Sequence, residues 1–194
     1  MCIRDRTTSD AVLLADAGEF EELMGDSKYE YTTLSIAGPM NGDDLRCLRQ
    51  MMGRDIDGSA TAGRLAQINM ADAHIVEGGG VYGSSRYTEN NVVGYGLFAD
   101  CTLLTSVTLP SDAVKIEKDA FMNCTALKEI TIPASATDIS PSSGCTALAA
   151  INVSAANTAY SSIDGVLFDA GATEILWFPI GKQGDYTLPS TVKA

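Results

Sequence analysis

A six-residue pattern of hydrophobic positions recurs along the chain, with apolar side chains at its first, fourth and sixth positions. Its clearest copies begin at Leu104, Leu127 and Leu148, so successive copies are 23 and 21 residues apart. A nearly constant period of this length indicates one supersecondary unit per repeat, stacked into a solenoid. Each unit adds a strand whose apolar side is buried only by its neighbouring units. The pattern therefore predicts a repeat fold.

Two earlier segments, residues 31–36 and 65–70, carry the same pattern and are predicted strands. Between strands, Phe98 stands in the register that Phe121 has in the next repeat. The repeat at 127–147 lacks this aromatic residue and is two residues shorter than the one before it. We therefore expect its coil to be thinner on the side opposite the strands.

A short amphipathic helix is predicted over residues 17–24, because Phe20, Leu23 and Met24 recur at i, i+3 and i+4. Gly25 is placed to end it. Such a helix would cover the apolar end of the first coil, which a solenoid needs at its terminus.

A second helix is predicted from the N-cap residue Asn41 to about Met52. Asp43 and Asp44 would lie in its first turn, where acidic side chains interact favourably with the helix dipole. Its inner stripe is formed by apolar residues at helical spacing: Leu45, Leu48, Met51 and Met52. Cys47 lies at the edge of this stripe and is predicted to be in the core.

The pattern changes after residue 153. Residues 162–168 and 173–178 are separated by Asp-Ala-Gly-Ala and predict a β-hairpin. Residues 173–179 also fit the strand pattern, so we expect the second arm to join the main sheet. In that register Trp177 faces solvent; the alternative is that it packs beneath the other arm of the hairpin.

Residues 71–90 form an insertion rich in Gly, Ser and Tyr, and residues 53–63 have the composition of a loop. Gly78–Gly83 matches the G-x-G-x-x-G string of dinucleotide sites, but no helical period follows it, as that mechanism requires. The insertion is either a solvated loop or a binding loop. If it is a binding loop, its contact residues would be Tyr82, Arg86 and Tyr87, because tyrosine and arginine make good contacts with ligands.

Charge narrows the classes of partner. The 194 residues include 25 acidic and 13 basic side chains, for a formal charge of −12. Nucleic acids and anionic membranes require clustered Lys and Arg, so neither is an expected partner, although solubility alone also explains the acidity. No apolar stretch approaches the length of about 18 residues that a membrane span needs.

Both ends of the sequence predict a fragment. Residues 1–6 look like translated adapter sequence, so we expect residues 1–10 to be non-native or frayed. At the other end, residues 186–189 begin another copy of the strand pattern. We predict one domain over 11–194: a helical cap at about 11–26, repeats over 27–153, and hairpin-containing repeats over 154–194.

These motifs resemble the BspA-type leucine-rich repeats of bacterial surface proteins. The match is specific over 104–148, where the family's elements follow in order: the strand, Pro, Ile, Ala-Phe, Cys and the next Leu. Residues 34–44 resemble the family's N-terminal coil, and residues 161–168 resemble its hairpin variant. Departures are Glu117 in place of a usual Gly, and Ser140-Pro141 in place of a helical turn. The resemblance implies an α/β solenoid, a right-handed superhelix with a parallel β-sheet on one face, short helices or turns on the other, and a β-hairpin insertion.

The resemblance also implies a secreted or cell-surface protein that acts through binding and adhesion, without a catalytic centre. We expect a protein or carbohydrate ligand and no cofactor or metal. A fold does not fix a function, so this is an analogy. Two alternatives stay open: a targeting arm of a larger secreted enzyme, and a passive structural spacer.

Candidate catalytic and metal-binding side chains are sparse. His74 is the sole histidine, no Gly-x-Ser-x-Gly elbow accompanies it, and we expect a loop or strand-edge residue. The cysteines lack the paired spacing of zinc sites. Cys101, Cys124 and Cys145 recur with the repeat and predict a ladder of buried, reduced thiols, although strand spacing alone does not exclude a disulfide.

The most informative surface is the outward face of the predicted sheet. If positions one, four and six of each strand point inward, positions two, three and five meet solvent. This face is small, polar and nearly uncharged. Its candidate ligand-binding residues are Thr105, Ser106, Thr108, Lys128, Glu129, Thr131, Asn152, Glu174, Ile175 and Trp177.

Overall fold

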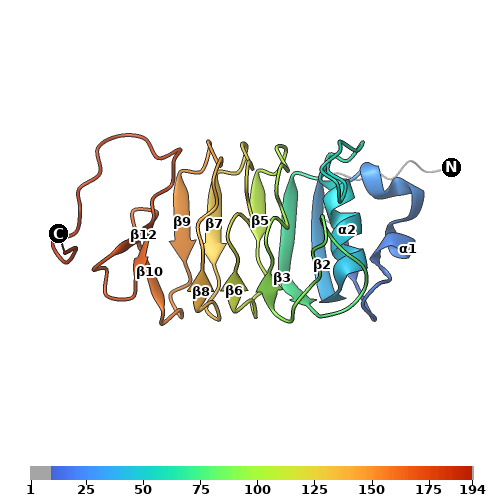
Figure 1. The fold of residues 1–194 in the computed structure, drawn as a ribbon, viewed down its shortest axis with the longest axis horizontal. Coiled ribbons are helices and arrows are strands. Elements are labelled where there is room, and N and C mark those ends of the chain that lie inside the picture. Colours follow the sequence, from blue (N-terminus) through green and yellow to red (C-terminus); the bar gives the residue numbers. More distant parts are fainter. Residues whose placement is uncertain (1–9, 194) are drawn as a thin grey trace.

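The structure is a computed structural model that describes residues 10–193. Coils stack in one direction, with the α-helices at one end of the row and the C-terminal segment at the other (Figure 1). The helical elements are α1 (Phe20–Met24), η1 (Gly25–Tyr29, a 3-10 helix) and α2 (Gly42–Met51). The strands are β1 (Asp10–Leu13), β2 (Thr33–Met40), β3 (Gln67–Ile75), β4 (Val92–Val93), β5 (Ser106–Thr108), β6 (Lys115–Ile116), β7 (Glu129–Ile132), β8 (Asp138–Ile139), β9 (Ala150–Val153), β10 (Tyr160–Ile163), β11 (Val166–Asp169) and β12 (Ile175–Trp177).

One parallel sheet runs the length of the repeats, with strand order β1-β2-β3-β5-β7-β9. Its register aligns Ile68 with Val107, Val107 with Ile130, and Ile130 with Ile151. All four are buried. The predicted repeat and its parallel sheet are therefore confirmed. The predicted non-native segment 1–10 lies outside the described residues except for Asp10, which begins β1.

The leucines that open the strand pattern form a second buried row. Leu65, Leu104, Leu127 and Leu148 each precede a paired residue of the sheet by three positions, and each is 0% exposed. Full burial of a leucine side chain contributes about 1.5–3 kcal/mol. Because each leucine is covered by the coils on both sides, this row couples neighbouring repeats.

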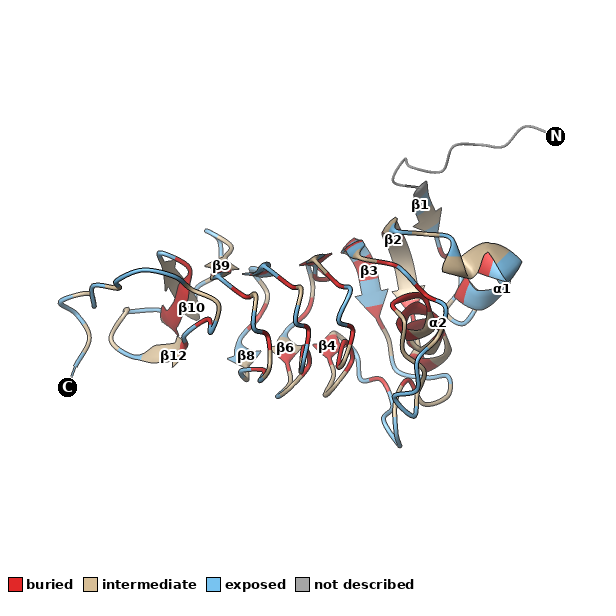
Figure 2. Cartoon of the chain, turned by 90° about the horizontal axis from the view of Figure 1, so that it is seen from above, coloured by how far each residue is buried: buried red, intermediate tan, exposed pale blue. Residues whose placement is uncertain are grey.

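The side of the repeats opposite the main sheet differs in detail from the expected short helices or turns. Alongside the turns, β4, β6 and β8 form a second parallel sheet, aligning Val93 with Ile116 and Ile116 with Ile139 (Figure 2). The rings of Phe98 and Phe121 stack with centroids 5.1 Å apart. The shorter coil has no such aromatic residue. There the Phe121 amide donates to the Ser142 hydroxyl (3.0 Å), whereas one coil earlier the Phe98 amide donates to the Ala120 carbonyl (2.8 Å).

The N-terminal end is covered by α1, which packs beside α2. The predicted helix over 17–24 is one turn shorter than expected, and Leu23 is exposed, contrary to prediction, while Phe20 and Met24 are buried. The predicted inner stripe of α2 is buried throughout. The sequence reasoning did not predict β1, which extends the sheet beyond β2 at this end.

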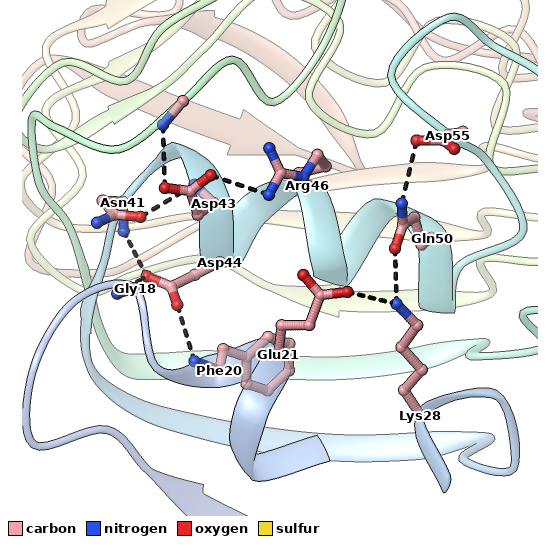
Figure 3. Close-up of polar contacts among 11 residues, drawn as sticks. Gly18, Phe20, Glu21, Lys28, Asn41, Asp43, Asp44, Arg46, Gln50 and Asp55 are labelled. Atoms are coloured by element: carbon pink, nitrogen blue, oxygen red, sulfur yellow. Dashed lines mark hydrogen bonds and ion pairs between the residues drawn. The ribbon is translucent and has the colours of Figure 1, made fainter. Parts of the chain in front are cut away.

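Asp44 ties the two helices together (Figure 3). Its carboxylate is fully buried and accepts hydrogen bonds from the backbone amides of Gly18 (2.7 Å), Phe20 (3.0 Å) and Asn41 (2.8 Å). The Asn41 side chain accepts from the Asp43 amide, so Asn41 and Asp44 form a capping box at the start of α2. One carboxylate thereby satisfies donors of two helix N-termini.

The glycine-rich string of the insertion packs on the same helix end. The Gly42 amide donates to the Gly78 carbonyl (3.0 Å), and the Gly80 amide donates to Asp43 (3.1 Å). A β-carbon at Gly42 would lie 1.8 Å from the Gly80 carbonyl oxygen, so the two backbones are in direct contact. These glycines allow close packing on α2.

The C-terminal strands form a separate antiparallel sheet, β10-β11-β12. The first predicted arm, 162–168, is itself divided by a turn at Asp164-Gly165. The expectation that the second arm joins the main sheet is wrong. The Asp169 carboxylate accepts hydrogen bonds from the Thr173 and Glu174 amides, closing a turn that reverses β12 onto β11.

The turn between β10 and β11 covers the last strand of the main sheet. The Ile151 amide donates to the Gly165 carbonyl (2.8 Å), and the Ser162 hydroxyl donates to the Ile151 carbonyl (2.6 Å). Gly165 has φ +75°, and a β-carbon there would lie 2.8 Å from that of Ala150. The hairpin therefore satisfies polar groups that β9 would otherwise expose at the sheet edge.

Candidate functional site

The outward face of the main sheet carries a continuous row of small polar side chains, which we call the polar ladder. The strand register aligns one residue from each of five neighbouring strands: Ser35, Asn69, Thr108, Thr131 and Asn152. Parallel strands lie about 4.8 Å apart, so hydroxyl and amide groups recur at that interval. None of the five carries a charge.

Exposure along the polar ladder is highest near its middle. Asn69, Thr108 and Thr131 are exposed, whereas Ser35 and Asn152 are half-buried. The Asn152 side chain donates to Glu129 (3.3 Å), and that of Asn69 accepts from the Ala71 amide (3.0 Å). The threonine hydroxyls at the centre are the ladder groups most open to a ligand.

A groove adjoins the polar ladder at the carboxyl ends of the strands. Its volume is about 230 Å³. Thr108 and Thr131 belong to both the polar ladder and the groove, which extends from β3 to the residue that follows β9. The lining is Ala71, Thr108, Leu109, Ser111, Thr131, Pro133, Ala134 and Ser154. Hydroxyl groups thus border a mainly apolar depression, a combination that suits binding sites.

Other predicted residues of the sheet face lie where expected. Ser106, Lys128 and Glu129 are exposed, and Thr105 is half-buried, with its hydroxyl donating to the Ala66 carbonyl (3.0 Å). Their participation in binding stays a prediction.

The predicted far end of this face is not part of it. Trp177 is only 7% exposed and packs in the core, Ile175 is half-buried and Glu174 is exposed. Because β12 pairs with β11 and not with β9, the inward and outward positions are reversed, and Phe178 is exposed instead. Of the two alternatives for Trp177, the structure shows packing against the hairpin.

The predicted binding loop is also divided. Tyr82 is 3% exposed, its hydroxyl donates to the Tyr95 carbonyl (3.2 Å), and burial raises the pKa of its phenol to about 12. It packs in the core, contrary to the exposed position expected of a loop contact, and its role in binding stays a prediction. Arg86 and Tyr87 are exposed, and the Arg86 guanidinium lies 4.4 Å from the centre of the Tyr95 ring.

His74 lies on β3, at an exposed position near its end. Its Nδ1 is 2.7 Å from an oxygen of Asp112. This is the strand-edge position expected for it. Among residues 10–193 there is no group of three or more His, Cys, Asp or Glu side chains that could hold a metal ion.

The repeated cysteines are buried free thiols, as predicted. The Cys124 thiol donates to the Phe98 carbonyl and the Cys145 thiol to the Phe121 carbonyl, each at 3.0 Å. Each therefore links its coil to the preceding one. Burial raises the pKa of Cys101 and of Cys47 to about 12, well above their ordinary value.

Sequence reasoning missed the groove because its lining includes residues beyond the strand pattern. A usable signal was present, since Pro110 and Pro133 each follow a copy of the pattern and mark where its strand ends.

The described part of the chain has no helix with the length and apolar character needed to cross a bilayer.

Comparison with known proteins identifies the repeats. Residues 88–171 match the BspA type Leucine rich repeat region in six copies. No curated protein matches the chain.

Three solved structures are similar to this chain. The pneumococcal vaccine antigen PcpA has a TM-score of 0.50 at 19% identity, over 84% of this chain and 40% of that one. A leucine rich cell surface protein from Faecalibacterium prausnitzii A2-165 has 0.46 at 22% identity (84% and 51%). A leucine-rich repeat protein from Eubacterium ventriosum has 0.43 at 20% identity (86% and 44%). The chain thus spans about half or less of their lengths, and the likeness to PcpA shows a shared fold alone.

Proposed function

Because residues 88–171 belong to the BspA-type leucine-rich repeat family, we propose that the protein binds a protein or carbohydrate ligand noncovalently through its sheet face. The polar ladder and its adjoining groove are the proposed contact surface. Binding of this kind needs no catalytic group, and the polar ladder contains no ionisable side chain.

The observation that carries this proposal is the continuity of the surface over successive coils. Thr108 and Thr131 are aligned neighbours on β5 and β7, both are exposed, and both line the groove. A ligand lying across the strands meets equivalent hydroxyl groups at each step and an apolar depression beside them. Repeat proteins use extended surfaces of this type for binding.

The chemistry of the surface favours an extended, largely uncharged ligand. The chain's one tryptophan is buried, so no exposed Trp serves as a large anchor on this face. Affinity would come from many modest hydrogen bonds and from apolar contact in the groove. A segment of a protein or a glycan chain that spans several coils meets these conditions.

We further propose that the protein is secreted or displayed at a bacterial cell surface, as in the family it belongs to. We also propose that the superhelix is right-handed and that the protein has no catalytic activity. The proposed domain limits are a cap at about 11–26, repeats at 27–153 and hairpin-containing repeats at 154–194. The structural relative PcpA is a vaccine antigen, which is consistent with this location.

A binding array of glycans and extracellular-matrix proteins, probed with the purified protein, tests the proposal. Thr131→Arg places a long charged side chain in the groove, whereas Thr125→Arg makes the same change at an exposed turn residue outside it. We expect captured ligands to be lost with Thr131→Arg and kept with Thr125→Arg. Equal capture by both variants would exclude the groove, and no capture by the unaltered protein would favour a spacer.

A further inference from the structure

A second cavity lies away from the polar ladder, between α2, two loops and the first turn after the insertion. Its volume is about 230 Å³, below the range of about 300–1,000 Å³ typical for drug-sized ligands. Charged side chains of both signs line it: Arg49, Arg86, Asp57 and Asp100. None of its lining residues lies on a strand of the main sheet.

Arg49 is the least expected of these residues, because it is only 4% exposed. Its Nη1 donates to the carbonyls of Gly96 (2.8 Å) and Leu97 (2.7 Å), and its Nη2 donates to the Asp55 carbonyl (3.5 Å). Its Nε has no hydrogen-bond partner among the described residues. No carboxylate among residues 10–193 forms an ion pair with it. Burying a charge without a counter-charge is costly, so this guanidinium provides an unbalanced positive charge at the cavity wall.

Arg86 adds a second guanidinium without a carboxylate partner among the described residues. Its stacking on the Tyr95 ring holds it at the cavity. Two arginines without acidic partners thus line one cavity of a chain that has 25 acidic and 13 basic side chains.

The two aspartates are held apart from these arginines by other hydrogen bonds. Asp57 accepts from the amide (2.8 Å) and hydroxyl (2.6 Å) of Ser59. Asp100 accepts from the Asn123 side chain (2.8 Å). The cavity therefore presents separated positive and negative groups that do not neutralise one another directly.

Backbone and side-chain hydrogen bonds fix the cavity walls in place. The Ser84 hydroxyl donates to the Ile56 carbonyl (3.2 Å), which joins the two loops. The Tyr82 amide donates to the Arg86 carbonyl, and the Arg86 amide donates to the Gly83 carbonyl, each at 3.0 Å. Walls ordered before binding reduce the entropy lost when a ligand enters.

We propose that this cavity binds a small dipolar ligand, a free α-amino acid, independently of the sheet face. Its carboxylate would lie against Arg49 and Arg86, since a guanidinium matches the planar geometry of a carboxylate. Its ammonium group would lie towards Asp57 and Asp100. A zwitterion balances both sets of charges, whereas a phosphate or sulfate ion would add negative charge beside two carboxylates.

The test is an NMR titration of the isotope-labelled protein with each common L-amino acid, up to about 10 mM, a range that detects millimolar affinity. We expect at least one amino acid to produce saturable shifts of the Gly83, Gly96 and Ser84 amides. Its analogues lacking either the amino group or the carboxylate should bind about tenfold more weakly or not at all. Absence of saturable shifts with every amino acid would overturn the proposal, and so would equal binding of the carboxylate-only analogue.

Matched variants locate the site. Arg86→Gln and Asp57→Asn change exposed cavity residues and should each weaken binding about tenfold. Arg64→Gln changes an exposed arginine outside the cavity and should have no effect. Equal effects of Arg86→Gln and Arg64→Gln would overturn the assignment, with a backbone spectrum of each variant confirming that it is folded.

Discussion

Two adjacent leucines provide a matched test of the buried row that couples the repeats. Leu104 is 0% exposed and stands in the row, whereas Leu103 is 49% exposed. The change to alanine removes the same atoms at both positions, one residue apart. Any difference in stability between the two variants therefore reports on burial and not on the chemistry of the substitution.

The expected magnitudes follow from these exposures. A fully buried leucine truncated to alanine typically costs about 2–5 kcal/mol, because transfer energy is lost and a cavity remains. The partly exposed leucine should cost less than about 1 kcal/mol. Leu104→Ala weakens contacts with the coils on both sides, since Leu65 and Leu127 are its equivalents in the row, so we expect about 3 kcal/mol or more.

Urea unfolding followed by circular dichroism and by the fluorescence of the buried Trp177 measures both variants. If the coils unfold together, the two signals should give the same midpoint, and Leu104→Ala should lower it far more than Leu103→Ala. Similar costs for the two variants would refute the assignment of Leu104 to a buried, coupling row.

Three further predictions concern the cap, the hairpin and the thiols. Asp44→Asn should lower the free energy of unfolding by about 2 kcal/mol or more, because an amide cannot accept all of the hydrogen bonds that the buried carboxylate receives. A change below about 0.5 kcal/mol in urea unfolding would contradict this prediction. Gly165→Ala should lower the free energy of unfolding by about 1–3 kcal/mol more than Gly184→Ala does, because both glycines have positive φ but only Gly165 contacts β9. Equal losses of stability would show that the contact between the hairpin and β9 is unimportant. Burial holds the pKa of Cys47 and Cys101 near 12, so between about pH 9 and 12 the unfolded chain loses thiol protons that the folded protein keeps. The free energy of unfolding should therefore fall by about 1.4 kcal/mol per pH unit for each thiol. If Cys101→Ala leaves this pH slope unchanged, the buried thiols are not its cause.

The repeat could be predicted from sequence because its inward positions recur with the period of the coil. Leu104, Leu127 and Leu148 occupy one buried row, and Thr108 and Thr131 lie outward, because parallel register preserves each position from strand to strand. Most of the candidate sheet face was predictable for the same reason.

Features without that period were not predictable in the same way. Trp177 fits the outward position of the strand pattern, but the turn closed by Asp169 pairs β12 with β11, and the face is reversed. Tyr82 lies in an insertion whose path depends on contacts with α2 and the following coil. Arg49 did carry a local signal, since it stands four residues after Leu45, on the apolar stripe of its helix.

The most direct test of sheet-face binding follows the threonine methyl signals of the labelled protein as a ligand captured on the array is added. The proposed function predicts that the methyl signals of Thr108 and Thr131 shift on binding, while those of the turn residues Thr125 and Thr146 stay unchanged. Shifts confined to the turn threonines, with Thr108 and Thr131 unmoved, would contradict it.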